Sequence, residues 1–306
     1  MTLHFMTPLL LDRIGITVVI GDKDAYYKLQ AKFYSMQKMQ GQLLPQGKIK
    51  VNKKEYEMRL DYYASFNKPD RRKIADITIG TYILNGVIKR YFKLTLYPSQ
   101  FKAGDFDRFK EILETELPDF RYEKLYYTGR VTYLELAVDS LTHKNHTFLP
   151  LRLYCSKSWI YPRKDGTRGT LYLGHKTSNM RTRFYNKRRK FLDAGKPVPY
   201  VQYPAQTRIE AVMRQLHHTP ATLPQMENPF RHILVIDLYK AESASNDPIW
   251  LELISMSKVT GLPKALSQFP QHRKNHMKAL KKLQVSWFHP EKIWSDLPNA
   301  VAIIAP

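Results

Sequence analysis

The sequence predicts an α+β protein, with an antiparallel-rich sheet core of two related halves and a C-terminal helical extension. Strand-like and helix-like stretches alternate in the order strand, helix, strands, helix, strands, which is typical of α+β folds. Beyond Pro220 the strand pattern stops and helical periodicity takes over. The chain has 306 residues, 43% of them hydrophobic, which is enough for a substantial core and more than one domain. We therefore expect α+β halves at 1–120 and 121–218 and a helical region at 219–306.

In the first half, runs rich in β-branched and aromatic residues predict strands. These runs lie at residues 14–20, 56–66, 74–84 and 89–97. Apolar residues at helical spacing predict helices at 22–40 and 105–117, and Pro118 closes the second one. Asn85 and Gly86 are a strong signal for a two-residue hairpin turn. We expect a basic loop at 41–54.

The second half contains a further set of predicted strands, of which 151–161 and 169–173 are expected to pair across a turn at 163–168. The predicted strands are 126–140, 151–161, 169–173, 181–187 and 207–214. Helices are expected over the remaining chain, and Pro270 interrupts the last of them. The predicted helices are 230–241, 248–257 and 262–283.

The charge balance restricts the class of partner. Lys and Arg number 49 and Asp and Glu 27, a formal net charge of +22, so a polyanion is the leading candidate. The alternative is a basic surface that serves solubility. Basic residues are interleaved with 20 Tyr and 14 Phe, and rings beside cations can stack on unpaired bases, although most of them will be core.

The sequence also indicates a compartment. Cys155 is the single cysteine, which excludes an internal disulfide framework and a Cys-based zinc cluster and suits a reducing cytoplasm. No apolar run reaches the length that spans a bilayer, and the N-terminus lacks the pattern of a signal peptide. We expect a cytoplasmic protein without a membrane partner.

A tyrosine in a row of cations is the most informative feature of the chain. Side chains alternate between the faces of a strand. One face of the strand at 181–187 therefore carries Arg181, Arg183, Tyr185 and Lys187. Such cations can bind a phosphodiester and stabilise charge in its transition state, while the phenol attacks phosphorus.

Carboxylates accompany this row on neighbouring predicted strands. Glu135 and Asp139 share one face of their strand, where acids are depleted, and could share Mg²⁺ or Mn²⁺. Arg208 and Glu210 lie on the polar face of the strand at 207–214. The alternatives are a solvated strand face or a salt bridge to a neighbouring arginine for the first pair, and a cross-strand ion pair for the second. Side by side, the three strands would form a floor suited to phosphoryl transfer.

Three segments carrying these residues resemble the replication initiation factor family, the trans-acting rolling-circle initiators of plasmids and filamentous phages. The segments are 134–139, 170–178 running into 183–187, and 208–210. The resemblance implies that Tyr185 is the nicking nucleophile and that Glu135, Asp139 and Glu210 hold a divalent metal, Mg or Mn. It also implies a 5′-phosphotyrosine intermediate, a free 3′-hydroxyl that primes synthesis, a host helicase and DNA polymerase as partners, and often a homodimer. This chain departs from the family at Glu135, where Asp is common.

Candidate contacts with origin DNA, single-stranded at the nick, surround the tyrosine strand. Besides the catalytic Tyr185, Arg183 and Lys187, they are Lys176, Ser178, Arg181, Arg188, Arg189 and Arg208. The basic run 187–190 could grip the DNA backbone or be a solvated turn. A basic amphipathic helix at 271–283 could enter a DNA groove or only pack, and the hairpins of the first half could instead recognise the origin.

The leading hypothesis is therefore an origin-specific nicking and religating enzyme that starts rolling-circle replication. A conjugative relaxase of the same chemistry is the nearest alternative. A non-catalytic DNA-binding repressor, in which Tyr185 only stacks, is the alternative from another class.

Overall fold

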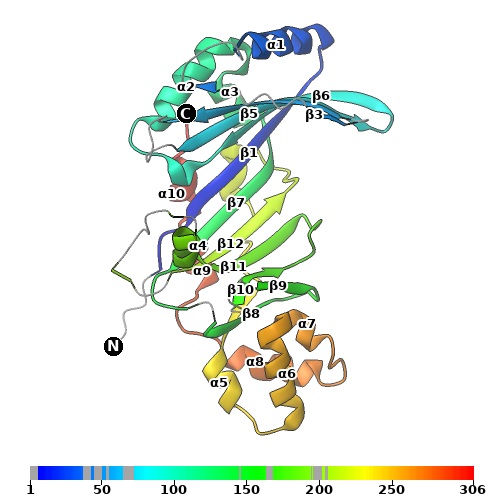
Figure 1. Ribbon diagram of the computed structural model, residues 1–306, viewed down its shortest axis with the longest axis vertical. Helices are drawn as coiled ribbons and strands as arrows, with labels where there is room; N and C mark the ends of the chain where they lie inside the picture. The colour runs from blue at the N-terminus through cyan, green and yellow to red at the C-terminus, as the bar shows by residue number, and fades with distance from the viewer. Residues whose placement is uncertain are drawn as a thin grey trace. The chain divides into compact units, whose positions relative to one another are not determined.

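The computed structural model of the chain has the predicted α+β fold, with antiparallel strands and C-terminal helices (Figure 1). It describes residues 6–36, 43–44, 50–52, 55–64, 72–144, 146–162, 168–193, 195, 202–203 and 206–306. Contacts divide the chain into two compact units. Unit 1 comprises Met1–Leu10, Leu136–Met213 and Glu227–Leu297, and unit 2 comprises Leu11–Glu135, Arg214–Met226 and Pro298–Pro306. These units are interleaved along the chain, unlike the contiguous regions expected from the sequence.

Unit 2 contains strands in the order β2-β4-β5-β6-β1-β7, with β3 paired to β4. Their bounds are β1 (Leu10–Ile20), β2 (Leu43–Leu44), β3 (Lys50–Asn52), β4 (Glu55–Tyr63), β5 (Lys73–Leu84), β6 (Val87–Leu96) and β7 (Arg130–Ser140). The predicted hairpin turn is confirmed, because Asn85 and Gly86 connect β5 and β6 with positive φ angles of 51° and 76°. The boundary between the units falls inside β7, after Glu135.

Helices cover the apolar face of these strands. They are α1 (Lys23–Met36), α2 (Asp105–Glu116) and α3 (Tyr122–Thr128), with short 3-10 turns η1 (Pro98–Gln100), η2 (Pro118–Phe120) and η3 (Pro220–Gln225). Phe109 of α2 packs its ring 5.2 Å from that of Tyr62. The predicted strand at 126–140 is wrong in its first part, because 126–128 form the end of α3, a helix that buries Tyr122 and Leu125. Its aromatic residues favoured a strand locally, but packing decides the outcome.

Unit 1 contains the strand order β7-β12-β11-β10-β9, and β9 ends the sheet. The other bounds are β9 (Ser158–Pro162), β10 (Arg168–Leu173), β11 (Met180–Asn186) and β12 (Thr207–Arg214). The expected pairing of the 151–161 and 169–173 segments is confirmed between β9 and β10, and the turn at 163–167 lies outside the described residues. The predicted strand at 181–187 ends one residue early, because Lys187 begins α4 (Lys187–Asp193).

A separate ribbon in unit 1 joins β8 (Phe148–Arg152) to β13 (Ile233–Asp237). The prediction of one strand at 151–161 is wrong, since the chain turns at Tyr154, whose φ is +61°. The prediction of a helix at 230–241 is also wrong in its first part. A short, buried apolar run fits a strand or a helix equally well by periodicity, and here it pairs with β8.

The C-terminal helices pack on this ribbon. They are α5 (Leu238–Ser243), α6 (Pro248–Thr260), α7 (Leu262–Leu266), α8 (Arg273–Lys282), α9 (Pro290–Trp294) and α10 (Leu297–Ala302). One apolar cluster joins Leu149 and Ile236 of the ribbon to Trp250, Leu262 and Leu280 of the helices. The sequence therefore predicted the helical region correctly but missed the strand that anchors it. No helix among the described residues combines the length and apolar character needed to cross a membrane.

A substitution at Gly261, between α6 and α7, tests how closely these helices pack on the strands. Its φ is +86°, and a Cβ there would lie 2.7 Å from Ser158 Oγ and 3.0 Å from Leu171 Cδ1. We expect Gly261→Ala to lower the free energy of unfolding by about 2 kcal/mol or more, from backbone strain and overlap. Urea denaturation measures the change. Gly21→Ala is the control, because Gly21 has open space around it, and an equal loss in both variants would contradict this view.

Candidate functional site

The register between β11 and β12 brings the predicted polar residues together. It sets Arg183 opposite Glu210 and Tyr185 opposite Arg208. Because side chains alternate along a strand, these four share one face. The opposite face is apolar, and Phe184 on it is buried. The prediction of a polar face on this tyrosine strand is confirmed.

Tyr185 is held by a carboxylate. Its hydroxyl donates a 2.5 Å hydrogen bond to Glu210 Oε1, and 2.5 Å separates Arg183 Nε from Glu210 Oε2. Tyr185 is only 7% exposed and Glu210 only 2%. Lys190, which the sequence placed in the basic run at 187–190 but not beside the tyrosine, has its ammonium 4.7 Å from the centre of the Tyr185 ring. The phenol therefore has a proton acceptor beside it and cations around it.

Asp139 forms a second buried cluster on the same sheet. Arg208 donates two hydrogen bonds to this carboxylate, at 2.6 and 2.9 Å, and Lys187 donates one at 2.7 Å. Burial opposes ionisation of Asp139, but the hydrogen bonds and charge of Arg208, with the charge of Lys187, outweigh it and lower the pKa of this carboxyl. Arg208 Nη1 also lies 4.0 Å from Glu210 Oε1, so one guanidinium lies beside both acids.

The change from strand to helix after Tyr185 has a local cause. Asn186 ends β11, and its side-chain Oδ1 accepts the backbone N–H of Arg189 at 2.8 Å. This is the bond of a helix N-cap, so α4 begins directly after Asn186. The Lys187 backbone N–H donates to Gln206 O at 2.7 Å, which keeps the first helical residue beside the sheet. Lys187 thus reaches Asp139 from a helix, whereas the sequence placed it on the strand.

Glu135 belongs to unit 2, where it accepts a hydrogen bond from the Tyr133 hydroxyl. The structure thus gathers Asp139 and Glu210 with their cations in unit 1. In the part of the chain that the structure describes, no group of three or more His, Cys, Asp or Glu side chains could hold a metal. Because guanidinium and ammonium groups contact both acids, this arrangement does not fit a divalent metal. The metal at these acids stays a prediction.

Comparison with known proteins adds little to this geometry. No protein-family model matches the sequence, and no curated protein matches it either. Among solved structures, the chain is similar to a rolling circle replication initiator protein from Geobacillus stearothermophilus. The identity is 13% and the TM-score 0.39, over 84% of this chain and 98% of that one. A likeness this distant carries no argument about function, which must come from the site itself.

The predicted DNA contacts near the tyrosine strand differ in their surroundings. Arg181 places its guanidinium 4.8 Å from the centre of the Tyr172 ring. Arg188 donates to the Tyr203 carbonyl at 3.2 Å. Arg189 is exposed, and its Nε lies 2.9 Å from an Asp193 carboxylate oxygen one helical turn away. Arg188 and Arg189 lie in the first turn of α4 and do not extend the strand as the sequence suggested.

The turn before β11 carries the remaining predicted contacts. Lys176 is exposed, whereas Ser178 is partly buried and its Oγ accepts the Met180 N–H at 3.3 Å. Sequence reasoning missed Tyr172, which lies directly opposite Arg183 on β10. Alternation along 168–173 puts Tyr172 on the opposite face from Leu171 and Leu173. Only the register with β11 shows that this face is the one that carries Arg183.

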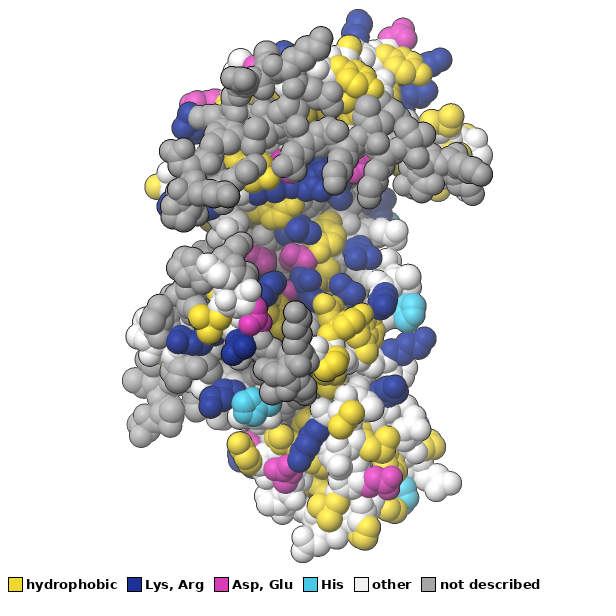
Figure 2. All heavy atoms as spheres, in the orientation of Figure 1, with side chains coloured by type: hydrophobic (Ala, Val, Ile, Leu, Met, Phe, Trp, Pro, Cys, Tyr) yellow, Lys and Arg dark blue, Asp and Glu magenta, His cyan; other side chains and the backbone are white. Residues whose placement is uncertain are grey.

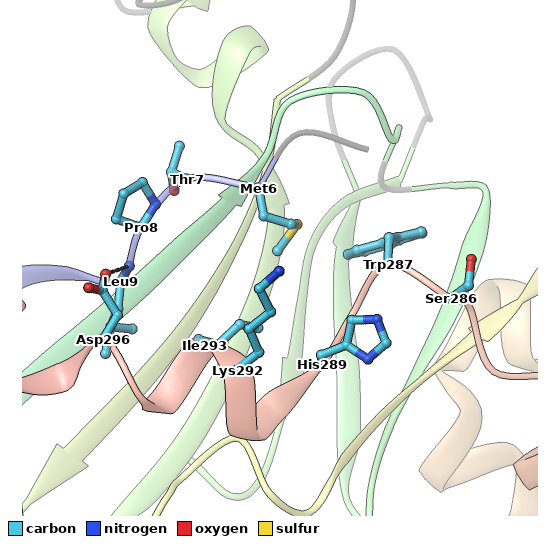
Figure 3. A pocket seen from close by; sticks show the side chains of 10 residues that line it. All are labelled: Met6, Thr7, Pro8, Leu9, Ser286, Trp287, His289, Lys292, Ile293 and Asp296. Carbon is cyan, nitrogen blue, oxygen red and sulfur yellow. Dashed lines mark hydrogen bonds between the residues drawn. The ribbon is translucent and has the colours of Figure 1, made fainter. Parts of the chain in front are cut away.

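A cavity of about 520 Å³ lies elsewhere in unit 1 (Figure 3). Lys292 extends toward Met6 there, and Asp296 accepts the Leu9 N–H at 2.9 Å. Among the residues that the structure describes, its lining includes none of the predicted site residues. The polar face of β11 and β12, where the predicted residues meet, is therefore the better candidate site.

The paired Asp139 predicts a pH-dependent contribution to stability. Its folded pKa lies below the unfolded value of about 3.9, so the contribution is present above that value and is lost as the pH falls through the folded pKa. We expect Asp139→Asn to cost about 3–5 kcal/mol near neutral pH, because it leaves buried cations unpaired. Urea unfolding at several pH values measures the difference in unfolding free energy between Asp139→Asn and the unmodified chain. We expect this difference to become smaller below about pH 4.

The control for this prediction is Asp193→Asn, which removes an exposed pair with Arg189. We expect it to cost about 0.5 kcal/mol or less. If the loss of unfolding free energy in Asp139→Asn stays the same as the pH falls below about 4, Asp139 is not an ionised, paired carboxylate in the folded chain.

Proposed function

We propose that the chain is a DNA nicking and religating enzyme that initiates rolling-circle replication, with Tyr185 as its nucleophile. The observation that carries the proposal is the hydrogen bond from the Tyr185 hydroxyl to Glu210, formed between Arg183 and Arg208. A nucleophile beside a base that a third group orients is a recurring arrangement in covalent catalysis. The net charge of +22 supports a nucleic acid as substrate.

In this mechanism Tyr185 Oη attacks phosphorus, and Glu210 Oε1 takes the phenolic proton. The bond from phosphorus to the 3′-oxygen breaks, and that oxygen leaves as a hydroxyl by taking a proton from water. Glu210 keeps the phenolic proton and returns it to the Tyr185 oxygen when the strand is rejoined. A phenol is a much weaker acid than a carboxylic acid, so complete transfer of the proton before the attack is strongly uphill. Proton transfer must therefore accompany formation of the new bond rather than precede it.

The cations have separate tasks in this proposal. Arg183 contacts the Glu210 oxygen that the phenol does not use, and so orients the base. Lys190, over the phenol ring, and Arg183, beside Glu210, would supply positive charge to an attacked phosphate. Lys187 and Arg208 hold Asp139 and fix the floor of the site. The product is a 5′-phosphotyrosine ester and a free 3′-hydroxyl, and attack by a hydroxyl on the ester restores the strand.

The partners follow from the same proposal. Origin DNA would be single-stranded at the nick, and the free 3′-hydroxyl would require a host helicase and a DNA polymerase for synthesis. We also expect the chain to form a homodimer and to act in the cytoplasm. A conjugative relaxase would use identical chemistry at a transfer origin.

A non-catalytic DNA-binding protein is the second candidate, and one observation favours it. Tyr185 is 7% exposed, so a phosphate reaches its hydroxyl only if nearby side chains, such as Lys190, move aside. In such a protein the bond between Tyr185 and Glu210 would serve stability alone.

Tyr185→Phe separates these candidates. It removes the attacking oxygen, so we expect no covalent attachment to a labelled single-stranded origin oligonucleotide, while binding persists. Denaturing gel electrophoresis measures the adduct. Tyr239→Phe is the control, since Tyr239 lies in the same unit and is 66% exposed. We expect Glu210→Gln to slow attachment by about 10²–10⁴-fold, as for loss of a general base. An undiminished adduct with Tyr185→Phe would refute the assignment.

The metal predicted at Glu135, Asp139 and Glu210 has its own test. If the prediction holds, EDTA abolishes the adduct and Mg²⁺ or Mn²⁺ restores it. An adduct undiminished in EDTA would contradict it and leave the arginines and lysines of the site as the charges that act on the phosphate.

A further inference from the structure

One row of side chains crosses the sheet of unit 1 and ends at the candidate base. Strand pairing sets Trp159 opposite Tyr172, Tyr172 opposite Arg183, and Arg183 opposite Glu210. Residues directly opposite each other on adjacent strands point to the same face. Neighbouring strands lie about 4.8 Å apart, so roughly 14 Å of sheet separates Trp159 from Glu210. The row therefore leads from the edge strand β9 to the acceptor of the Tyr185 proton.

The outer part of the row is aromatic. The Trp159 and Tyr172 rings are stacked, with centroids 5.3 Å apart and planes within 7°. Tyr161 meets Tyr172 edge-on at 5.3 Å, and Arg181 lies 4.8 Å from the centre of the Tyr172 ring. Tyr161 is 47% exposed, and the other three are partly exposed. We call these four residues the aromatic face.

Tyr172 lies on the opposite side of β10 from the apolar core. The other side of β10 carries Leu171 and Leu173, which are buried and supply the packing of this strand. Figure 2 shows Lys and Arg side chains beside hydrophobic ones in the middle of the view, where Figure 1 draws β9, β10 and β11. Rings interleaved with cations on an accessible sheet face suit a single nucleic-acid strand, because the rings stack on bases and the cations attract phosphates.

We propose that the aromatic face binds the unpaired bases of the DNA strand whose phosphate reaches Tyr185. Bases stack on Trp159 and Tyr161, and the Arg181 guanidinium stacks on a further base or pairs with a phosphate. This site rests on the proposed function for its place beside the nick, but its binding of single-stranded DNA can be measured without any cleavage. A duplex hides the faces of its bases, so the site selects unpaired DNA.

The test compares two labelled strands of about 12 nucleotides, one of oligothymidylate and one of the same length with abasic sugars. Fluorescence anisotropy gives the dissociation constants for the whole chain. We expect Trp159→Leu and Tyr161→Ala each to weaken oligothymidylate binding by about 5- to 150-fold, the range for loss of one stacked base. Binding of the abasic strand should not change, since its phosphates remain. Tyr127→Ala is the control, because Tyr127 is 56% exposed in the other unit.

The two strands separate the possible outcomes. Equal weakening on both strands, or none on either, would overturn the aromatic face. Tyr161→Ala keeps the test valid if Trp159→Leu unfolds, because Tyr161 is largely exposed. Covalent attachment is scored separately on the origin oligonucleotide. Base-dependent binding without an adduct would support the aromatic face and contradict the nicking activity. An adduct without base-dependent binding would support the nicking activity and contradict the aromatic face.

Discussion

Two carboxylates are buried on one face of the sheet, and they determine where the neighbouring cations and Tyr185 lie. Asp139 and Glu210 are 1% and 2% exposed, and a buried charge is tolerated only when it is paired and hydrogen-bonded. Arg183, Arg208 and Lys187 meet this requirement from β11, β12 and the first residue of α4. The position of each cation is thus set by an acid, and that of Tyr185 by the same Glu210.

This pairing unites stability and chemistry in the same side chains. A hydrogen bond that fixes the Tyr185 hydroxyl also presents it to a proton acceptor, and preorganisation of this kind costs nothing at the moment of reaction. The stacked Trp159 and Tyr172 extend the rigid surface toward the edge strand. A strand of DNA lying along the row would meet rings first and fixed charges last.

The sequence predicted what depends on local pattern. Alternation placed β12 at its observed bounds, and Asn85 with Gly86 defined the β5–β6 hairpin. It also put Arg183 and Tyr185 on one face. Pairing partners depend on register between distant segments, which one sequence does not contain. The structure was therefore needed to show that Tyr185 bonds to Glu210 and that Tyr172 faces Arg183. It was also needed to show that β13 is a strand.

The charge count of the site has a consequence for what it attracts. Arg183, Lys187, Lys190 and Arg208 carry four positive charges against two negative ones on Asp139 and Glu210, which leaves +2. A single phosphodiester carries −1, so one backbone linkage halves the net charge of the group and two would neutralise it. Binding of DNA thus lowers the charge of the site, and inorganic anions such as sulfate should compete with DNA for it more strongly than their screening of the bulk solution explains.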